Sequence, residues 1–169
     1  MKIRPLAPGV VLCLLPMLAY AGLIHVPGEY ATIQAAVDAA SDGDTILIAD
    51  GTYSGPGNIG IQWDARSKHL VIRSENGREH CIIDCQGQDR GFLLDQGQDH
   101  RDVIDGLTIT NVGGVVAGVA ILIDFTSPRI INCGLLNNNT GGDQALFAGG
   151  GAIMINDKAF PIIQGNIII

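Results

Sequence analysis

The feature that most constrains the fold is a set of short Ile-, Val- and Leu-rich runs that recurs from residue 58 to the last residue. Three kinds of run follow one another in a fixed order. Runs of the second kind begin near Leu70, Asp102, Arg129 and Pro161, which are 32, 27 and 32 residues apart. Each run has the length and composition of a β-strand, so the pattern predicts three strands per coil and about four coils. The first kind covers 58–64, 91–95, 119–124 and 151–156, the second 70–74, 102–105, 128–132 and 161–164, and the third 81–84, 107–110, 134–137 and 166–169.

This repeat excludes most β architectures. The links between runs hold no helix and are too short for the crossovers of a doubly wound sheet. A sandwich would alternate apolar and polar residues, whereas these runs are apolar almost throughout. A solenoid fits, because each coil stacks on the one before it, like strands pair in parallel, and inward side chains form continuous columns. Two-residue corners would join the second and third strands at Asp105-Gly106, Asn132-Cys133 and Gln164-Gly165, since these residue types bond backbone groups at bends.

One helix is expected ahead of the repeat. The segment 32–40 has helical periodicity, with Thr32 as the N-cap and Gly43 as a stop signal just beyond it. Its apolar face would consist of Ile33, Ala36, Val37 and Ala40.

The first 21 residues have the pattern of a signal peptide. Lys2 and Arg4 precede a short apolar run over 10–18, and Ala-Tyr-Ala at 19–21 offers a cleavage site. We expect cleavage after Ala21 and a secreted, periplasmic or cell-surface protein with no membrane span after cleavage. An uncleaved anchor is the alternative, which three prolines within the segment disfavour. The expected organisation is a signal peptide over 1–21, an N-terminal cap with the helix over 22–43, and a parallel β-helix over 44–169.

The net charge and the cysteine content limit which binding partners and which covalent or metal cross-links are expected. Loss of Lys2 and Arg4 changes the formal charge from −7 to −9, which speaks against binding to nucleic acid or to an anionic membrane. The three cysteines outside the leader are odd in number and lack a Cys-x-x-Cys pair, so neither a disulfide framework nor a zinc site is expected. We expect Cys81, Cys85 and Cys133 to be small buried hydrophobic residues.

Several segments resemble a known family. The stretch VPGEYATIQAAVDAASDGDTILIADGTYS (26–54) resembles the opening of right-handed parallel β-helix proteins of the pectin-lyase-like superfamily, pectinesterases included. VIDGLTITN (103–111) and SPRIINCGLLNNNTGG (127–142) look like the coils of secreted bacterial β-helix repeat proteins. The resemblance covers most of residues 24–169. It implies an all-β, right-handed parallel β-helix whose N-terminal end is covered by the helix at 32–40. It also implies a polysaccharide groove over the outer face of the first kind of strand.

Polar residues recur at the ends of the first-kind strands. In stacked coils, neighbouring members of this set would lie about 5 Å apart. The set consists of Asp64, Asp95, Asp124 and Asn156. Three carboxylates at such short distances repel one another unless a bound cation compensates their negative charge. The functional interpretation is a calcium or sugar-hydroxyl site, with calcium held by Asp64, Asp95 and Asp124. The alternative, that Asp and Asn recur because they initiate turns, accounts for the same pattern and is preferred at this stage. The candidate binding residues are Trp63, Asp64, Asp95, Asp124, Asn156 and Asp157.

No catalytic set can be assembled from the sequence. The outer positions of the first-kind strands in the second to fourth coils carry no arginine or lysine, so a lyase would lack its base and charge stabilisation. We therefore expect a scaffold or surface module that contacts extracellular or cell-wall polysaccharide. The alternatives are the N-terminal part of a pectate-lyase- or pectinesterase-like enzyme and a structural spacer or adhesin. The chain ends within the fourth repeat, so we expect either a truncated chain or one whose open end is covered by a partner, with self-association through the open C-terminal coil as one way to cover it.

Overall fold

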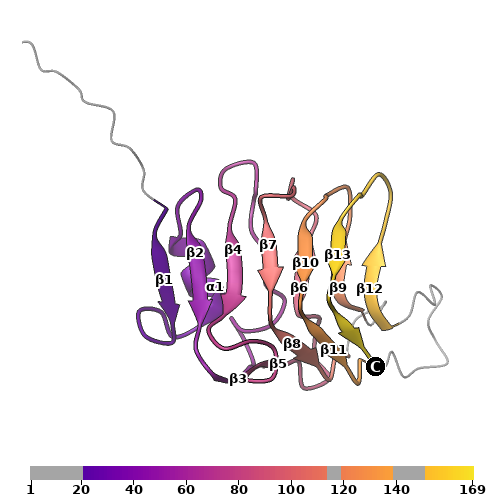
Figure 1. Ribbon diagram of the computed structural model, residues 1–169, viewed down its shortest axis with the longest axis horizontal. Coiled ribbons are helices and arrows are strands. Elements are labelled where there is room, and N and C mark those ends of the chain that lie inside the picture. The colour runs from indigo at the N-terminus through magenta and orange to yellow at the C-terminus, as the bar shows by residue number, and fades with distance from the viewer. Residues whose placement is uncertain (1–20, 114–118, 139–150) are drawn as a thin grey trace, which may run out of the picture.

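The computed structural model describes residues 21–113, 119–138 and 151–169, so all but the last residue of the expected signal peptide lies outside the described residues. These residues form a parallel β-solenoid of about four turns with little helix (Figure 1). The prediction of a parallel β-solenoid is confirmed.

The strands form three sheets in which every pairing is parallel. The six-stranded sheet contains β1 (Leu23–Val26), β2 (Thr45–Ile48), β4 (Val71–Ser74), β7 (Val103–Asp105), β10 (Arg129–Ile131) and β13 (Ile162–Gln164). The five-stranded sheet contains β3 (Gly51–Ser54), β5 (Cys81–Asp84), β8 (Thr108–Thr110), β11 (Gly134–Leu136) and β14 (Ile167–Ile168). The three-stranded sheet contains β6 (Phe92–Leu94), β9 (Val119–Ile123) and β12 (Gly151–Ile155).

One run expected to be a strand, 58–64, forms only isolated bridges. On one side Ile61 pairs with Phe92 at the edge of the three-stranded sheet. On the other side the neighbour is not a strand but the Gln34 side chain of the helix. This amide donates to the Gln62 carbonyl (3.0 Å) and accepts from the Gln62 N–H (3.1 Å), so it takes the place of a strand partner for one residue only.

The core consists of aliphatic columns that run along the solenoid axis. The pairing of β2, β4, β7 and β10 places four isoleucines directly on top of one another, and each is fully buried. A fully buried isoleucine contributes roughly 1.5–3 kcal/mol, so these columns dominate the stability of each coil. The four residues are Ile46, Ile72, Ile104 and Ile130.

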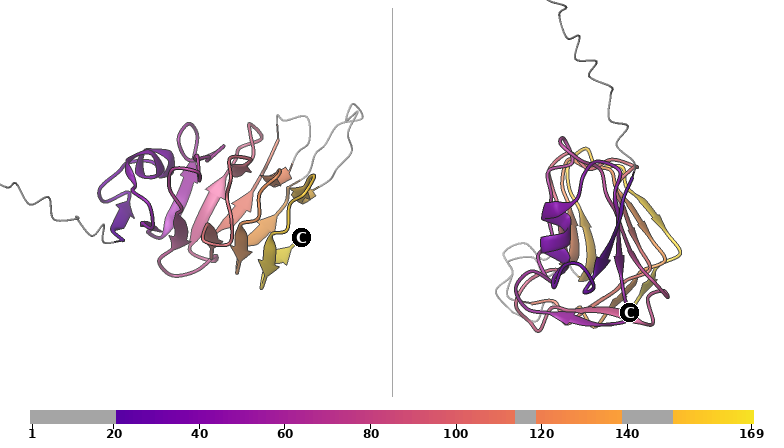
Figure 2. Two further views of the ribbon diagram at one scale, coloured as in Figure 1. Left: turned by 90° about the horizontal axis from the view of Figure 1, so that it is seen from above. Right: turned by 90° about the vertical axis from the view of Figure 1, so that its left-hand side faces the viewer.

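Helix α1 (Ile33–Ala39) begins and ends close to where its sequence signals lie. The Thr32 hydroxyl accepts from the Ala35 N–H, and the four residues expected to form the apolar face are all buried. At the other end, the Lys68 ammonium donates to the carbonyls of Val37, Asp38 and Ala40. The helix thus obtains from a later loop the positive charge that its own last turn lacks. It packs against β1 and β2 at the N-terminal end of the described chain (Figure 2).

One of the three predicted corners between the six- and five-stranded sheets lies one residue earlier than expected. Asn132 pairs in register with Gly106 and Gly165, and all three adopt the left-handed backbone conformation (φ 55°, 68° and 69°). The corner therefore lies at Ile131-Asn132 and not at Asn132-Cys133. Asn tolerates this conformation better than other side chains, and its amide also donates to Asp105 Oδ1 in the preceding coil (2.9 Å).

A single arginine crosses this row of bends. Arg78 lies in the loop between β4 and β5, and its carbonyl accepts from the Thr108 hydroxyl (2.7 Å). Its guanidinium Nη1 donates to the carbonyls of Asn132 (3.1 Å) and Gly165 (3.0 Å). One residue from an early coil is thereby bonded to each of the three coils that follow.

Candidate functional site

Five of the six predicted site residues belong to one row of loops, here called the loop column, and the sixth, Trp63, directly precedes it. It consists of the segments 64–69, 95–102, 124–128 and 156–161, which follow the strands or bridges of the three-stranded sheet and lead into the six-stranded sheet. The pairings Leu94↔Ile123 and Ile123↔Ile155 place Asp95, Asp124 and Asn156 at equivalent positions of successive coils. The sequence therefore aligned these three positions correctly.

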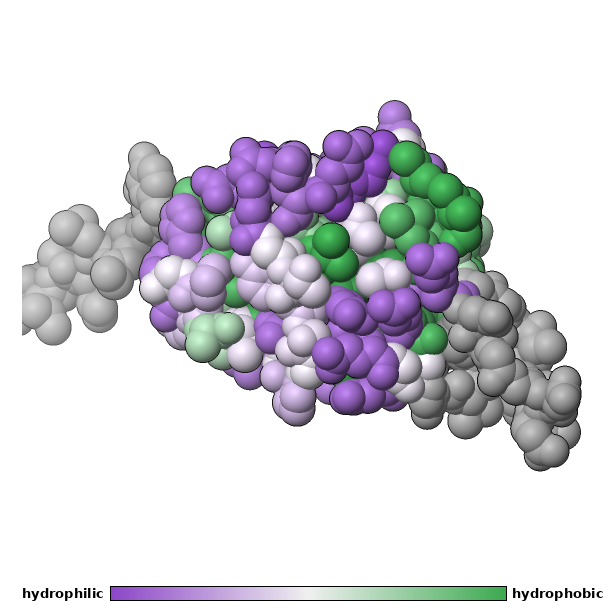
Figure 3. Space-filling view, turned by 90° about the horizontal axis from the view of Figure 1, so that it is seen from below, coloured by the Kyte–Doolittle hydropathy of each residue, from purple (hydrophilic) through white to green (hydrophobic). Residues whose placement is uncertain are grey.

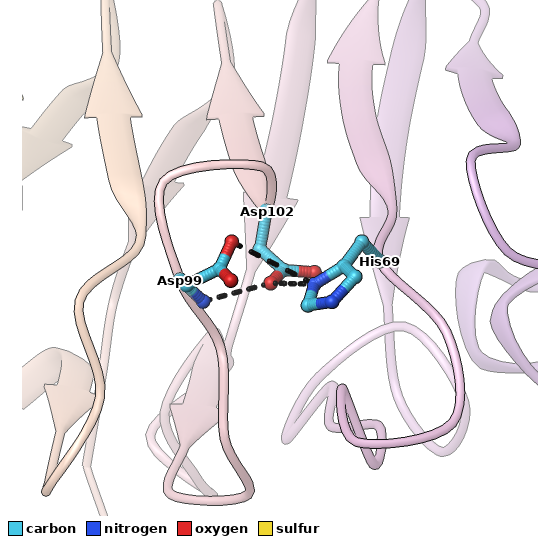
Figure 4. A group of neighbouring side chains, drawn as sticks. All are labelled: His69, Asp99 and Asp102. Atoms are coloured by element: carbon cyan, nitrogen blue, oxygen red, sulfur yellow. Dashed lines mark hydrogen bonds and ion pairs between the residues drawn. The ribbon is translucent and has the colours of Figure 1, made fainter.

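The first half of the loop column is organised around Asp102, which is fully buried. Its Oδ1 accepts from the Trp63 indole N–H (3.1 Å) and the Leu70 N–H (3.0 Å). Its Oδ2 accepts from the Asp99 N–H (2.9 Å) and lies 2.8 Å from His69 Nδ1 (Figure 4). A carboxylate only accepts, so Nδ1 of His69 is the donor in this contact. The side chain of His69 is only 15% exposed.

This network was not anticipated from the sequence. His69 and Asp102 are 33 positions apart, and only the stacking of coils brings them together. One sequence signal could have indicated this contact. Leu70 and Asp102 are aligned because each begins a run of the second kind. This alignment placed both residues at the same edge of neighbouring coils.

His69, Asp99 and Asp102 form the one group of three metal-ligand side chains in the described residues whose ligand atoms lie within 4.8 Å of one another. Both oxygens of Asp102 already accept two hydrogen bonds each. Asp99 is held by the Arg101 guanidinium (2.7 Å), which lowers the pKa of the Asp99 carboxyl well below its usual range. A metal ion would have to displace the hydrogen-bond donors of Asp102, and it would lie close to the positively charged guanidinium of Arg101. The arrangement fits a satisfied structural network better than a metal centre.

Two of the predicted binding residues have other roles. Trp63 is 4% exposed and donates to Asp102, so its ring packs in the core and is not available to a sugar. Asp64 pairs with Arg66 (2.8 Å), and this hydrogen-bonded guanidinium lowers the pKa of the Asp64 carboxyl. In the described part of the chain, Asp64, Asp95 and Asp124 do not form a group with ligand atoms within 4.8 Å. Calcium binding by these three carboxylates stays a prediction, because the three side chains do not form a preformed cluster.

The second half of the loop column borders a hollow of about 630 Å³ that is widely open to solvent. Three of the six predicted binding residues, Asp124, Asn156 and Asp157, line it. A volume of this size falls within the range of small-ligand sites, and convergent polar side chains are what such sites use for recognition. The remaining lining residues are Phe125, Ile155 and Ala159.

Phe125 is the lining residue that sequence reasoning missed. Its side chain is 61% exposed, although phenylalanine is usually buried. Its backbone has φ 52°, a left-handed conformation that is costly for a bulky residue. The equivalent position of the preceding coil is Gln96, because Asp95 and Asp124 are aligned, so the fold itself does not require an aromatic ring here. A strained, exposed ring beside polar groups is characteristic of a functional position.

A second hollow, of about 400 Å³, lies over the outer face of the five-stranded sheet. Figure 3 shows the molecule from this side, with apolar residues gathered toward one end. Four of the eight lining residues are large aliphatic ones, and the three polar lining residues are Arg78, Glu79 and Thr108. The lining comprises Arg78, Glu79, Ile82, Thr108, Gly134, Leu136, Ile167 and Ile169.

Comparisons with protein-family models, with curated proteins and with solved structures found no match for this chain. Among the described residues, no helix is long and apolar enough to span a membrane.

Proposed function

We propose that this protein is an exported surface module that binds polysaccharide in the hollow formed by Asp124, Phe125, Asn156 and Asp157. The observation that carries the proposal is the placement of a strained, exposed aromatic ring beside two carboxylates and an amide in one concavity. The apolar face of a pyranose ring packs against an aromatic side chain, which removes apolar surface of both from water. Carboxylates accept hydrogen bonds from sugar hydroxyls, and an amide both accepts and donates.

The proposal also includes the arrangement of strands in each coil and the role of the helix. Each complete coil would contribute one strand to each sheet, and α1 would cover the N-terminal end of the core. Burial of the apolar face of α1 against β1 and β2 supports this. A right-handed helix of the pectin-lyase-like kind, preceded by a signal peptide cleaved after Ala21, is consistent with the resemblance of 26–54 to that superfamily.

A binding role is favoured over catalysis by the character of the hollow. Its lining holds two carboxylates, an amide and no arginine, lysine or histidine. A lyase needs a base and a positive group beside the sugar carboxylate. The carboxylates of the hollow could act as a base, but its lining residues include no positive group. The proposal is therefore retention of a glycan chain on the protein surface, with the stacked coils as a rigid support.

Phe125→Ala tests this proposal. Loss of a stacking contact worth roughly 1.5–3 kcal/mol should weaken glycan binding by about tenfold or more. The measurement is a screen of the purified protein on a glycan array, followed by titration calorimetry with the best oligosaccharide. Leu23→Ala is the matched control, because Leu23 is also exposed (53%) but lies in β1 at the far end of the six-stranded sheet.

The control should bind as the parent protein does, and both variants should keep the parent's melting temperature within a few degrees. Absence of any glycan binding by the parent protein would refute the proposal and leave the structural spacer as the better account. Equal affinity of the parent and Phe125→Ala would remove the hollow as the binding site.

A further inference from the structure

The carboxylates of the loop column differ in how they are neutralised. In each of the first two coils one carboxylate pairs with an arginine two residues later, Asp64 with Arg66 and Asp99 with Arg101. Asp124 and Asp157, in the next two coils, take part in none of the ion pairs found within the described residues. Asp95, in the second coil, also takes part in none of these ion pairs, but it does not line the hollow. Both carboxylates that line the hollow are therefore without a cationic partner within the described residues.

The charged side chains that line the hollow are all of one sign. No cationic side chain is among the residues that line it. Lys158 lies between two of the lining residues in sequence, but it is exposed and is not itself part of the lining. Since field lines concentrate in a concave site with walls of one sign, the hollow should attract positively charged groups and repel anions.

The aromatic ring restricts which cation can be bound. A bare metal ion would gain nothing from Phe125, and calcium requires six to eight oxygen ligands, whereas the hollow offers two carboxylates and one amide. An organic cation with an extended apolar face satisfies both parts of the site. Its ammonium group faces the carboxylates, and its ring face packs on Phe125.

We infer that the ligand class is a glycan with free amino groups, such as a β-linked glucosamine oligomer, and not the acidic polysaccharides that the family resemblance suggests. This inference rests on the proposed function and specifies its ligand. In such a complex Asp124 and Asp157 would pair with protonated amines of the sugar chain. A uronic acid polymer would instead bring its carboxylates against those of the hollow, at a cost in free energy.

The test compares four oligosaccharides of equal length at about pH 6, where a free amine carries its proton. They are a glucosamine oligomer, its N-acetylated counterpart, a neutral glucan oligomer, and a galacturonate oligomer with and without calcium. The glucosamine oligomer should bind about tenfold or more tightly than the other three, and its affinity should fall as salt is raised, because salt screens exposed charges.

Two charge variants locate the effect. Asp124→Asn and Asp157→Asn should each weaken binding of the glucosamine oligomer roughly fivefold and change binding of the neutral oligomer less than twofold. Asp50→Asn, an exposed carboxylate at the end of β2, is the control and should change neither.

The outcomes separate this inference from the proposed function. Equal binding of the glucosamine, N-acetylated and neutral oligomers would overturn the charge selectivity and leave the polysaccharide-binding proposal intact. Tightest binding of galacturonate, above all with calcium, would overturn it in favour of a calcium bridge. Absence of binding to every oligosaccharide would refute both.

Discussion

Replacement of Asp102 by asparagine should cost a large part of the stability of the chain. The amide oxygen of an asparagine could still accept from Trp63 and Leu70. Its NH₂ group would replace Oδ2, which accepts from the Asp99 N–H and from His69 Nδ1. His69 can recover one bond by changing tautomer, whereas the Asp99 N–H would face another donor.

The magnitude follows from these contacts. Hydrogen bonds to a charged group contribute roughly 1.5–3 kcal/mol each, and a polar group left unpaired costs roughly 1–3 kcal/mol more. With one or two bonds lost, Asp102→Asn should lower the free energy of unfolding by roughly 2–4 kcal/mol. That is a substantial fraction of the total of about 5–15 kcal/mol that is typical of a folded domain.

Urea denaturation followed by tryptophan fluorescence measures this loss. Trp63 is the single tryptophan of the chain and is itself a donor to Asp102, so its emission reports on the network directly. Asp95→Asn, at an exposed position of the same loop column, should change the unfolding free energy by less than about 0.5 kcal/mol. If Asp102→Asn unfolds within that same margin of the parent protein, the network does not stabilise the coils and the reasoning fails.

Two further predictions concern other parts of the fold. Lys68→Met keeps the aliphatic stem but removes the ammonium from the carbonyl end of α1, and should cost about 1–2 kcal/mol in the same urea assay. Arg73→Met, at an exposed position of β4, should cost less than about 0.5 kcal/mol; equal losses would contradict the capping role. Burial raises the thiol pKa of two cysteines to about 12 and of a third to about 11, so a thiol reagent should label them only after unfolding. Stability should also fall from about pH 9 upward, because the unfolded thiols ionise there and the native ones do not; rapid labelling of the native protein would refute this. The three residues are Cys81, Cys85 and Cys133.

The strands of the repeat could be predicted because their signal is local and recurs. The Ile/Val/Leu runs at 70–74, 81–84 and 91–95 each contain the strand that the structure shows, since an inward residue in one coil needs an equivalent in the next. The strands β1, β2 and β3 were missed because they precede the regular part of the repeat. The run at 58–64 was overpredicted, because its outer partner is the Gln34 side chain and not another strand.

The site was harder to predict because its contacts join residues of different coils. Asp124, Asn156 and Asp157 were identified from their positions at strand ends, and they do line one hollow. Phe125 follows directly after Asp124, yet its exposure depends on a left-handed backbone conformation that the sequence does not reveal. The sequence left open whether Trp63 stacks on a sugar or packs in the core, because its acceptor, Asp102, lies 39 positions away in the chain.

Arg78 has a consequence for how the solenoid unfolds. In a stack whose coils contact only their neighbours, stability is a sum of nearest-neighbour terms, and the ends can fray one coil at a time. Through its carbonyl and guanidinium, this residue bonds one early coil to Thr108, Asn132 and Gly165 in three later ones. Loss of the last coil therefore also releases a contact made by an early one. This coupling between non-adjacent coils favours a single cooperative transition over stepwise fraying, as in a domain held by long-range contacts.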